Sequence, residues 1–197
     1  MLLGLAAVAL GACTDDAPAA FETTTFDGSV PRGTSFDAPS AASSDDVQPE
    51  GFSTITARIT ETDGDVCEVC VWLADSSDER ARGLMWVTDL GDAVGMVFRH
   101  DEPVTERFYM LNTPTPLSIA WFSPDGRYAV STDMEPCLEV PEGGCPLYGP
   151  GVDYELALEV FEGGLDELGI GPGARLELVA GTEGDTCALA SASAATP

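Results

Sequence analysis

Five cysteines could form disulfide bonds or a redox or metal centre, depending on where the fold places them. Cys137 and Cys145 bracket a short loop with one proline and two glycines, so we expect the chain to fold back and join them. Cys67 and Cys70 form a Cys-x-x-Cys pattern, which as a redox motif needs a helix N-terminus but lies here in an expected strand. Residues three apart in a strand are too distant to bridge and point to opposite faces. We therefore expect one of this pair to bond with Cys187 and the other to be a buried thiol, with a redox or zinc role as the alternative.

The N-terminus carries the pattern of an export signal. Residues 2–12 form an apolar run of signal-peptide length that is too short to span a bilayer. The run ends in Leu10-Gly11-Ala12-Cys13, which resembles the lipobox of bacterial lipoproteins and implies that Cys13 becomes a lipid-modified anchor in the membrane. No Lys or Arg precedes the run, so a plain secretory signal and an uncleaved anchor are alternatives. All three interpretations place the protein outside the cytoplasm.

Polar and aromatic side chains in the middle of the chain are the candidates for ligand binding. We predict a binding site made of Arg82, Met110, Asn112, Thr113 and Tyr148. Arg82 would anchor an anionic or hydroxyl-rich ligand, although a surface arginine that bonds loop carbonyls has the same sequence signature. The aromatic residues Trp86, Tyr109, Trp121 and Tyr148 could stack on sugars or fill the core.

Two other chemistries stay open as alternatives. The methionines Met85, Met96, Met110 and Met134 could bind a soft metal such as Cu(I), but we expect them to fill gaps in the core. The 34 acidic residues allow two-carboxylate catalysis on a glycan, but no pair stands out. A hydrolase triad is not supported, because the chain has no Gly-x-Ser-x-Gly and its one histidine, His100, is expected in an exposed loop. We predict no cofactor, no metal site and no catalytic residue.

The charge balance limits the possible partners. The chain has 34 Asp and Glu against 8 basic residues, all arginine, for a formal net charge of -26. Binding to nucleic acid needs a basic surface, so we exclude nucleic acid as the main partner. We also expect the protein to be a monomer. The absence of lysine excludes Schiff-base enzymes and P-loop nucleotide binding.

The elements that must position these residues are mainly short strands. Hydrophobic alternation and turn signals predict strands over 54–60, 66–74, 95–99, 108–111, 117–122, 128–130, 154–161 and 175–179. A capping-box pattern of Ser76 with Glu79 predicts a short helix that Gly83 ends, and residues 165–168 predict one helical turn. The segment Ser123-Pro124-Asp125-Gly126 predicts a hairpin turn, which with 108–111 makes a three-stranded meander. The fold class is mainly β, a small barrel-like or sandwich domain with one or two short helices.

Composition divides the chain into four parts. Residues 1–12 form the lipoprotein signal peptide, and residues 13–51, rich in acidic residues, Pro, Ser and Thr, form a disordered tether. Residues 52–182 form a single β-rich domain around one core, and residues 183–197 form a flexible tail.

A series of motifs resembles one known family. The motifs are Arg80-Ala81-Arg82-Gly83-Leu84-Met85, Gly95-Met96-Val97-Phe98, Phe108-Tyr109-Met110-Leu111-Asn112-Thr113, Leu156-Ala157-Leu158-Glu159-Val160 and Gly169-Ile170-Gly171-Pro172-Gly173. In this order over residues 66–179, they resemble the prokaryotic family catalogued as domain of unknown function 192. The resemblance implies a compact, mostly β, barrel-like domain and leaves the biochemical role open. Leu111, Ser118 and Trp86-Val87 stand where many members have charged residues, so an ionic site at those positions is missing here.

These observations favour a membrane-tethered, non-enzymatic domain that binds a ligand or a component of the cell envelope. The alternatives are an envelope enzyme that acts on glycan through carboxylates and a copper-binding protein. Strand alternation places Phe108 and Met110 on the core face with Ile119 and Trp121, and leaves Asn112 near the barrel mouth. We therefore expect Asn112→Ala to weaken ligand binding by about 1 to 3 kcal/mol, and Met110→Ala to destabilise the domain by roughly 2 to 5 kcal/mol. Equal destabilisation by both would make Asn112 a turn residue only.

Overall fold

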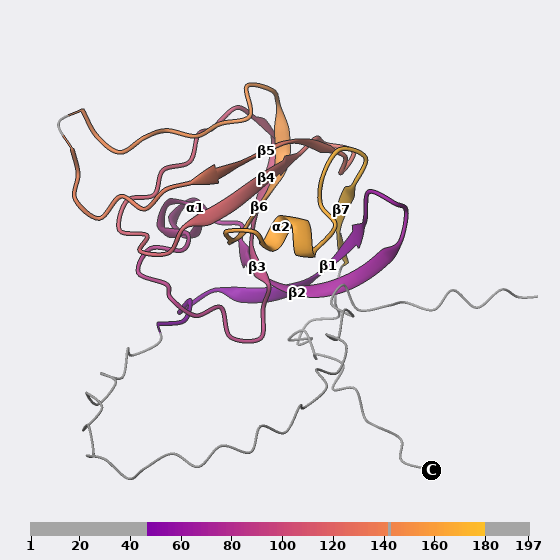
Figure 1. Ribbon diagram of the computed structural model, residues 1–197, viewed down its shortest axis with the longest axis horizontal. Helices are drawn as coiled ribbons and strands as arrows, with labels where there is room; N and C mark the ends of the chain where they lie inside the picture. Colours follow the sequence, from indigo (N-terminus) through magenta and orange to yellow (C-terminus); the bar gives the residue numbers. More distant parts are fainter. Residues whose placement is uncertain (1–46, 142, 180–197) are drawn as a thin grey trace, which may run out of the picture. The chain divides into compact units, whose positions relative to one another are not determined.

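The computed structural model describes residues 47–141 and 143–179, which form a curled seven-stranded sheet and two short helices (Figure 1). The strands are β1 (Ser53–Thr60), β2 (Val66–Ala74), β3 (Gly95–Val104), β4 (Leu117–Phe122), β5 (Tyr128–Met134), β6 (Tyr154–Phe161) and β7 (Arg175–Val179). The helices are α1 (Ser77–Arg82) and α2 (Gly164–Glu167). The predicted mainly β fold is confirmed.

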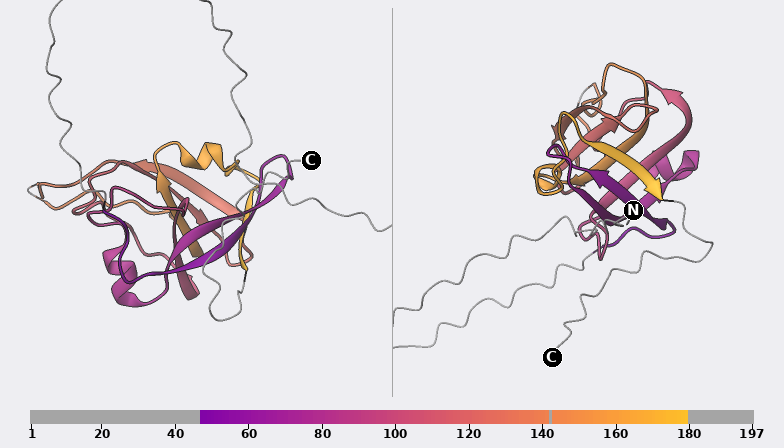
Figure 2. Two further views of the ribbon diagram at one scale, coloured as in Figure 1. Left: turned by 90° about the horizontal axis from the view of Figure 1, so that it is seen from below. Right: turned by 90° about the vertical axis from the view of Figure 1, so that its right-hand side faces the viewer.

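The sheet has the order β5-β4-β6-β3-β2-β1-β7 and curls until its two edge strands meet at one end (Figure 2). Neighbours are antiparallel except β2 and β3, and the segment containing α1 makes the crossover that this parallel pair requires. At the meeting point Arg127 bridges Arg175, and the backbone N–H of Leu176 donates to the carbonyl of Gly126 over 2.9 Å. The sheet is therefore barrel-like, although it does not close along its full length.

The strands β3, β4 and β6 are buried on both faces, so the domain has two hydrophobic clusters where the sequence predicted one core. The inner cluster receives residues from all of the strands, for example Ile59, Val97, Phe122 and Leu176, and fills the barrel. The outer cluster lies on the opposite face of β3, β4 and β6 and is covered by the segments that follow α1, β3 and β5. This second layer explains why all six residues of β4 are buried.

Several turn and cap signals form as the sequence predicts. Ser76 and Glu79 make both bonds of the capping box at the start of α1, and Gly83 ends that helix. Gly126 closes the β4–β5 hairpin by donating to the carbonyl of Ser123 over 2.7 Å. Gly126 has a φ of 78°, and a Cβ there would lie 2.6 Å from the carbonyl oxygen of Leu176. Glycine is thus required both for the turn and for the approach of β7.

The predicted strand over residues 108–111 does not form, so the three-stranded meander is wrong and only its β4–β5 hairpin exists. Phe108 and Leu111 make isolated bridges instead, with Tyr148 and Cys137 in the loop after β5. The inward assignment is confirmed, because Met110 is 1% exposed and belongs, with Phe108 packed against it, to the same cluster as Ile119 and Trp121. That cluster lies outside the barrel, so this segment does not lead to the barrel mouth.

The described part of the chain begins at Val47, which is bonded to the segment that follows α1. The backbone N–H of Val47 donates to the Thr88 hydroxyl over 3.0 Å, and the Thr88 N–H donates back to the Val47 carbonyl over 2.9 Å. The predicted signal peptide, the lipidated Cys13, the tether up to residue 46, the tail and Cys187 lie outside the described residues. Within residues 47–141 and 143–179, no helix is long and apolar enough to cross a lipid bilayer.

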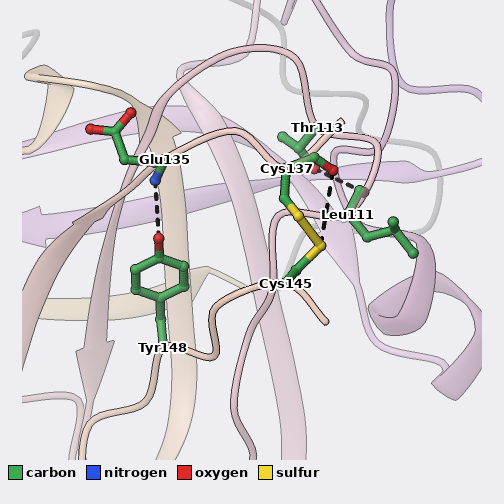
Figure 3. Close-up of a disulfide and its surroundings, with 6 residues drawn as sticks. All are labelled: Leu111, Thr113, Glu135, Cys137, Cys145 and Tyr148. Atoms are coloured by element: carbon green, nitrogen blue, oxygen red, sulfur yellow. Dashed lines mark hydrogen bonds between the residues drawn. A yellow bond between two sulfur atoms is a disulfide. The ribbon is translucent and has the colours of Figure 1, made fainter. Parts of the chain in front are cut away.

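Disulfide bonding is more extensive than the sequence predicts. Cys137 and Cys145 are joined, as predicted (Figure 3). Cys67 and Cys70 are both disulfide-bonded as well, so the expectation that one of them is a thiol is wrong. Cys67 belongs to the inner cluster and Cys70 does not, in agreement with the predicted alternation along their strand. Because the two point to opposite faces, each can have a different bonding partner.

Candidate functional site

A pocket lies in the outer layer, between the exterior face of β3 and β6 and the segments that cover it. Its cavity volume is about 70 Å³, which is below the range of sites for drug-sized ligands and leaves room for a small group only. The wall is formed by α1 and residues 83–85, by residues 106–110 with Thr113, and by Phe98, Tyr154 and Glu159. The pocket therefore joins residues from four separate parts of the chain.

Three arginines line this pocket, and none of them forms an ion pair with an acidic residue that the structure describes. Of the arginines in the described parts of the chain, Arg58, Arg99, Arg127 and Arg175 form ion pairs with carboxylates. The remaining three, Arg80, Arg82 and Arg107, all line the pocket. Within the described residues of this strongly acidic chain, the arginines without an acidic partner are thus collected at one place.

The guanidinium groups of Arg80 and Arg82 are held in place by neutral contacts. Arg80 donates through Nη1 to the backbone carbonyls of Asp75 and of Arg99, the latter over 3.1 Å. Arg82 donates through Nη2 to the carbonyl of Glu50 over 2.7 Å and lies 4.2 Å from the centre of the Phe52 ring. A guanidinium has five N–H donors, so each group keeps donors for a ligand while its position is fixed.

Glu159 brings a carboxyl group to the buried side of the pocket. It projects from β6 on the outer face, between Met96 of β3 and Ile119 of β4, and is 5% exposed. Burial raises the pKa of this carboxyl to about 8. Glu159 is therefore neutral at pH 7, and its side chain makes no hydrogen bond to any residue that the structure describes.

A histidine and a tyrosine also line the pocket. His100 is buried in β3 and packs edge-to-face on Tyr154, with ring centroids 5.5 Å apart. Burial, followed by the charge of Arg80, lowers the pKa of His100, and burial raises the pKa of Tyr154. The predicted exposed position of His100 is wrong, because β3 continues past Arg99 and carries His100 on the same face as Phe98.

The predicted site residues are only partly brought together. Arg82, Met110 and Thr113 line the pocket. Asn112 does not, and it has a left-handed φ of 56° that places it in a turn. Tyr148 does not line the pocket either, and its hydroxyl accepts the backbone N–H of Glu135 over 3.2 Å (Figure 3).

The loop closed by the Cys137–Cys145 disulfide is hydrogen-bonded to the segment that forms one wall of the pocket. The N–H of Cys137 donates to the carbonyl of Met110 over 3.1 Å, and the N–H of Asn112 donates to the carbonyl of Cys137 over 3.1 Å. Phe108 and Tyr148 exchange backbone hydrogen bonds of 2.7 and 2.9 Å. Asn112 and Tyr148 thus belong to the frame that holds Met110 and Phe108 in the pocket wall, and Figure 3 shows the disulfide next to Leu111 and Thr113.

The methionines behave as core residues. Met96, Met110 and Met134 are buried in the outer cluster, as predicted, whereas Met85 is not part of that cluster and lines the pocket. No group of three or more His, Cys, Asp or Glu side chains that could hold a metal ion occurs in the described parts of the chain. One buried polar atom in the same cluster, Nε1 of Trp121, lacks a hydrogen-bond partner among these residues.

Sequence reasoning missed Glu159, Glu106 and Arg107. A signal for Glu159 was present, because it is an acidic residue inside the apolar strand Leu156–Phe161, where carboxyl groups are rarely buried without a partner. Arg107 and Glu106 had no comparable signal, since they lie in a segment whose path depends on contacts with the loop after β5.

Comparisons with known proteins agree with this fold. The model of the DUF192 family, described as "Uncharacterized ACR", matches residues 58–178. A crystal structure from Sinorhizobium meliloti 1021, described as a "putative transcription regulator", is 25% identical and has a TM-score of 0.56, covering 64% of this chain and 95% of the other. A protein of unknown function from Novosphingobium aromaticivorans DSM 12444 is 30% identical and has a TM-score of 0.55, covering 65% of this chain and 87% of the other. No curated protein matches the chain.

Proposed function

Because this chain belongs to the DUF192 family, a family of unknown function, we propose a function from its own pocket: it binds a small organic anion without transforming it. The protein would do so as a lipid-anchored domain outside the cytoplasm. The ligand would be a metabolite or a fragment of the cell envelope that carries a carboxylate or phosphate group.

The observation that carries this proposal is the position of the unpaired arginines. Arg80, Arg82 and Arg107 line one pocket, whereas the arginines elsewhere in the described parts of the chain pair with carboxylates. Guanidinium groups bind carboxylates and phosphates through charge-assisted hydrogen bonds, which are among the stronger polar contacts in proteins. An anion is therefore the ligand that this wall favours.

The protonation states in the pocket support the same conclusion. Glu159 is neutral below about pH 8, and the lowered pKa of His100 keeps that ring neutral as well. Glu106 and three arginines are the other acidic and basic residues of the lining. The local balance is positive, in contrast to a chain whose net charge is -26. A positive pocket on an acidic protein selects small anions, because a large polyanion would be repelled by the surrounding surface.

That repulsion also argues against nucleic acid as the ligand. One structural relative is described as a transcription regulator, but a protein that neutralises phosphates along a duplex needs an extended basic surface. With 8 arginines, no lysine and 34 acidic residues, this chain does not provide one.

The proposed location rests on the N-terminal sequence and on the disulfides. Leu10-Gly11-Ala12-Cys13 has the lipobox pattern, and disulfide bonds persist mainly in oxidising compartments. The Cys137–Cys145 bond supports an exported protein.

Binding of benzoate and benzamide to the full chain tests the proposal. The two probes have the same shape, but only benzoate is an anion, and the aromatic wall of Phe98, Phe108 and Tyr154 suits both rings. Ligand-observed NMR or calorimetry at pH 7 should detect benzoate and not benzamide. Arg107→Gln should weaken benzoate binding by about tenfold to a hundredfold, the usual range for a hydrogen bond to a charged group.

Arg127→Gln provides the matched control, because Arg127 pairs with Asp125 in the β4–β5 turn and does not line the pocket. It should leave benzoate binding unchanged. Equal binding of benzoate and benzamide, or equal loss in both variants, would contradict the proposal.

An envelope enzyme that acts on glycan is the second candidate, and one observation favours it. Glu106 and Glu159 line the same pocket, and Glu159 is a neutral acid at pH 7, as a general acid in a glycosidase must be. Hydrolysis of fluorogenic glycosides by the full chain would support this candidate if Glu159→Gln and Glu106→Gln each abolished turnover. If the chain binds benzoate but does not hydrolyse such substrates, the result would exclude this enzyme and support the binding function.

A further inference from the structure

The carboxyl group of Glu159 lies where it does not contribute to the stability of the fold. Its neighbours across the sheet are Met96 and Ile119, and Ala157 and Phe161 flank it along the same face of β6. A buried polar group without a hydrogen bond destabilises a protein, and an apolar side chain of similar size would pack there without that penalty. The side chain is 5% exposed and lines the pocket. A role in the pocket accounts for its presence.

The neighbours of this carboxyl in the sheet are apolar, and it makes no ion pair with a residue that the structure describes. Burial alone raises the pKa of Glu159, and no charged neighbour contributes to that shift. The titratable or charged residues that share the pocket are Arg80 and Arg82 of α1, His100 of β3, Glu106, Arg107 and Tyr109 of the covering segment, and Tyr154 of β6. Leu84, Phe98, Phe108 and Met110 line the pocket as well. The pocket lining thus combines three cations and several apolar side chains with one buried carboxylic acid.

The protonation state of the carboxyl decides what it can recognise. A neutral carboxylic acid donates one O–H hydrogen bond, whereas a carboxylate only accepts hydrogen bonds. An ionised Glu159 would select a ligand cation, which Arg80, Arg82 and Arg107 would repel. A neutral Glu159 selects an uncharged acceptor, which is compatible with an anion bound to the arginines.

We infer that Glu159 donates a hydrogen bond to an uncharged oxygen of the ligand, at the end of the ligand away from its acid group. The inference rests on the proposed anion binding and defines the ligand class more closely. The pocket takes an organic anion with an apolar or aromatic body and a carbonyl, ether or hydroxyl oxygen remote from the carboxylate or phosphate. A simple inorganic anion lacks both the body and the remote acceptor.

Two benzoates of equal charge and similar shape test this inference on the full chain. The probe 4-acetylbenzoate carries a carbonyl acceptor opposite its carboxylate, and 4-isopropylbenzoate does not. At pH 6.5 we expect 4-acetylbenzoate to bind about tenfold more tightly, which corresponds to one buried hydrogen bond. At pH 9 the preference should disappear, because Glu159 is then ionised. Burial and the charge of Arg80 lower the pKa of His100, and the Glu159→Leu variant, which keeps His100, controls for any change in the charge of that ring.

Three variants test whether the hydrogen-bond donor of Glu159 causes the preference for 4-acetylbenzoate. Glu159→Gln keeps an N–H donor and cannot ionise, so the preference for 4-acetylbenzoate should persist at both pH values. Glu159→Leu removes the donor, so both probes should bind equally at both pH values while benzoate itself still binds. Glu155→Gln, on the same strand but outside the pocket lining, should behave like the wild type.

The possible failures are distinguishable. Binding of both probes with equal affinity to the wild type at pH 6.5 overturns the role of Glu159 and leaves the anion site intact. A preference that survives in Glu159→Leu also overturns it. If neither probe nor benzoate binds, the proposed anion binding fails for aromatic acids, and the inference fails with it. Melting curves confirm that each variant is folded before its affinity is measured.

Discussion

At the scale of single residues, Glu159 couples the pocket to the stability of the domain. Its carboxyl is neutral in the folded protein up to about pH 8, whereas in the unfolded chain it ionises near its ordinary value of 4.5. Between these values the folded state holds a proton that the unfolded state releases. The stabilisation from that proton is complete below about pH 4.5 and is lost as the pH rises through 8.

The corresponding prediction compares Glu159→Gln with the wild type across that interval. From pH 4.5 to 8.5 the free energy of unfolding of the wild type should fall by roughly 3 to 5 kcal/mol more than that of the variant. Urea unfolding at pH 4.5, 6.5 and 8.5 measures the difference. The comparison cancels the titration of the other acidic residues, which both proteins share. Parallel pH profiles would show that Glu159 is not held neutral by the fold.

Asn112 is a second residue whose role changes once its backbone is known. Its φ of 56° lies in the left-handed region, where asparagine is tolerated and alanine is strained. Its carbonyl accepts the N–H of Trp86 over 2.7 Å, so the turn also fixes the segment after α1.

We now expect Asn112→Ala to destabilise the domain by about 1 kcal/mol, with benzoate affinity unchanged. Asn112→Gly should cost less, because glycine adopts this φ without strain. Met110→Ala should cost roughly 2 to 5 kcal/mol through its buried cavity. Thermal and chemical unfolding of the three variants measure the order of their stabilities. Weaker benzoate binding in Asn112→Ala at unchanged stability would restore the sequence-based assignment of Asn112 to the site.

At the scale of elements, the loop closed by Cys137 and Cys145 supports the pocket wall. Its backbone is hydrogen-bonded to Met110 and Asn112, and Phe108 is bridged to Tyr148 just beyond the disulfide. The segment 106–113 has no strand partner within the main sheet, so this loop is its main backbone support.

Replacing Cys137 and Cys145 together by serine should lower stability by about 2.5 kcal/mol, the chain-entropy estimate for a loop of this length. Hydrogen exchange should increase most at residues 108–113. The double substitution is a cleaner test than a reducing agent, because Cys67 and Cys70 are disulfide-bonded too. Unchanged exchange in that segment would show that the loop does not support the wall.

At the scale of the whole molecule, the net charge of -26 bears on the proposed anion binding. An acidic surface repels anions in general, so under that proposal a small anion would be attracted only by the locally positive pocket. The proposed lipid anchor would keep this pocket at the membrane surface and in an oxidising compartment.

The anchor yields a prediction for the full chain. Cys13→Ser should move the protein from the membrane fraction to the soluble fraction, because only the cysteine thiol accepts the lipid. Labelling with radioactive palmitate should mark the wild type and not the variant. Unchanged partitioning, or an unlabelled wild type, would exclude lipidation at Cys13.

Most of the secondary structure could be predicted from the sequence, since it depends on neighbouring residues. Strand alternation predicted the core of every strand in the sheet, and the Ser76–Glu79 capping box and the Gly126 turn form as expected. The Cys137–Cys145 bond belongs to the same group, because a short loop with proline and glycines brings its ends together by itself. Such features involve contacts between residues close in the chain, so local patterns determine them.

The pocket was decided by tertiary structure alone. Arg80, Arg107 and Glu159 come from segments far apart in sequence and meet only because the exterior face of β3, β4 and β6 is covered by a second layer. The nearly continuous apolar run of β4 indicates burial on both faces, but it does not say which segments cover the outer face. The absence of acidic partners for three arginines and the neutrality of Glu159 are also properties of the assembled surroundings. Both depend on burial and on distances between remote groups, which a sequence of residue types does not contain.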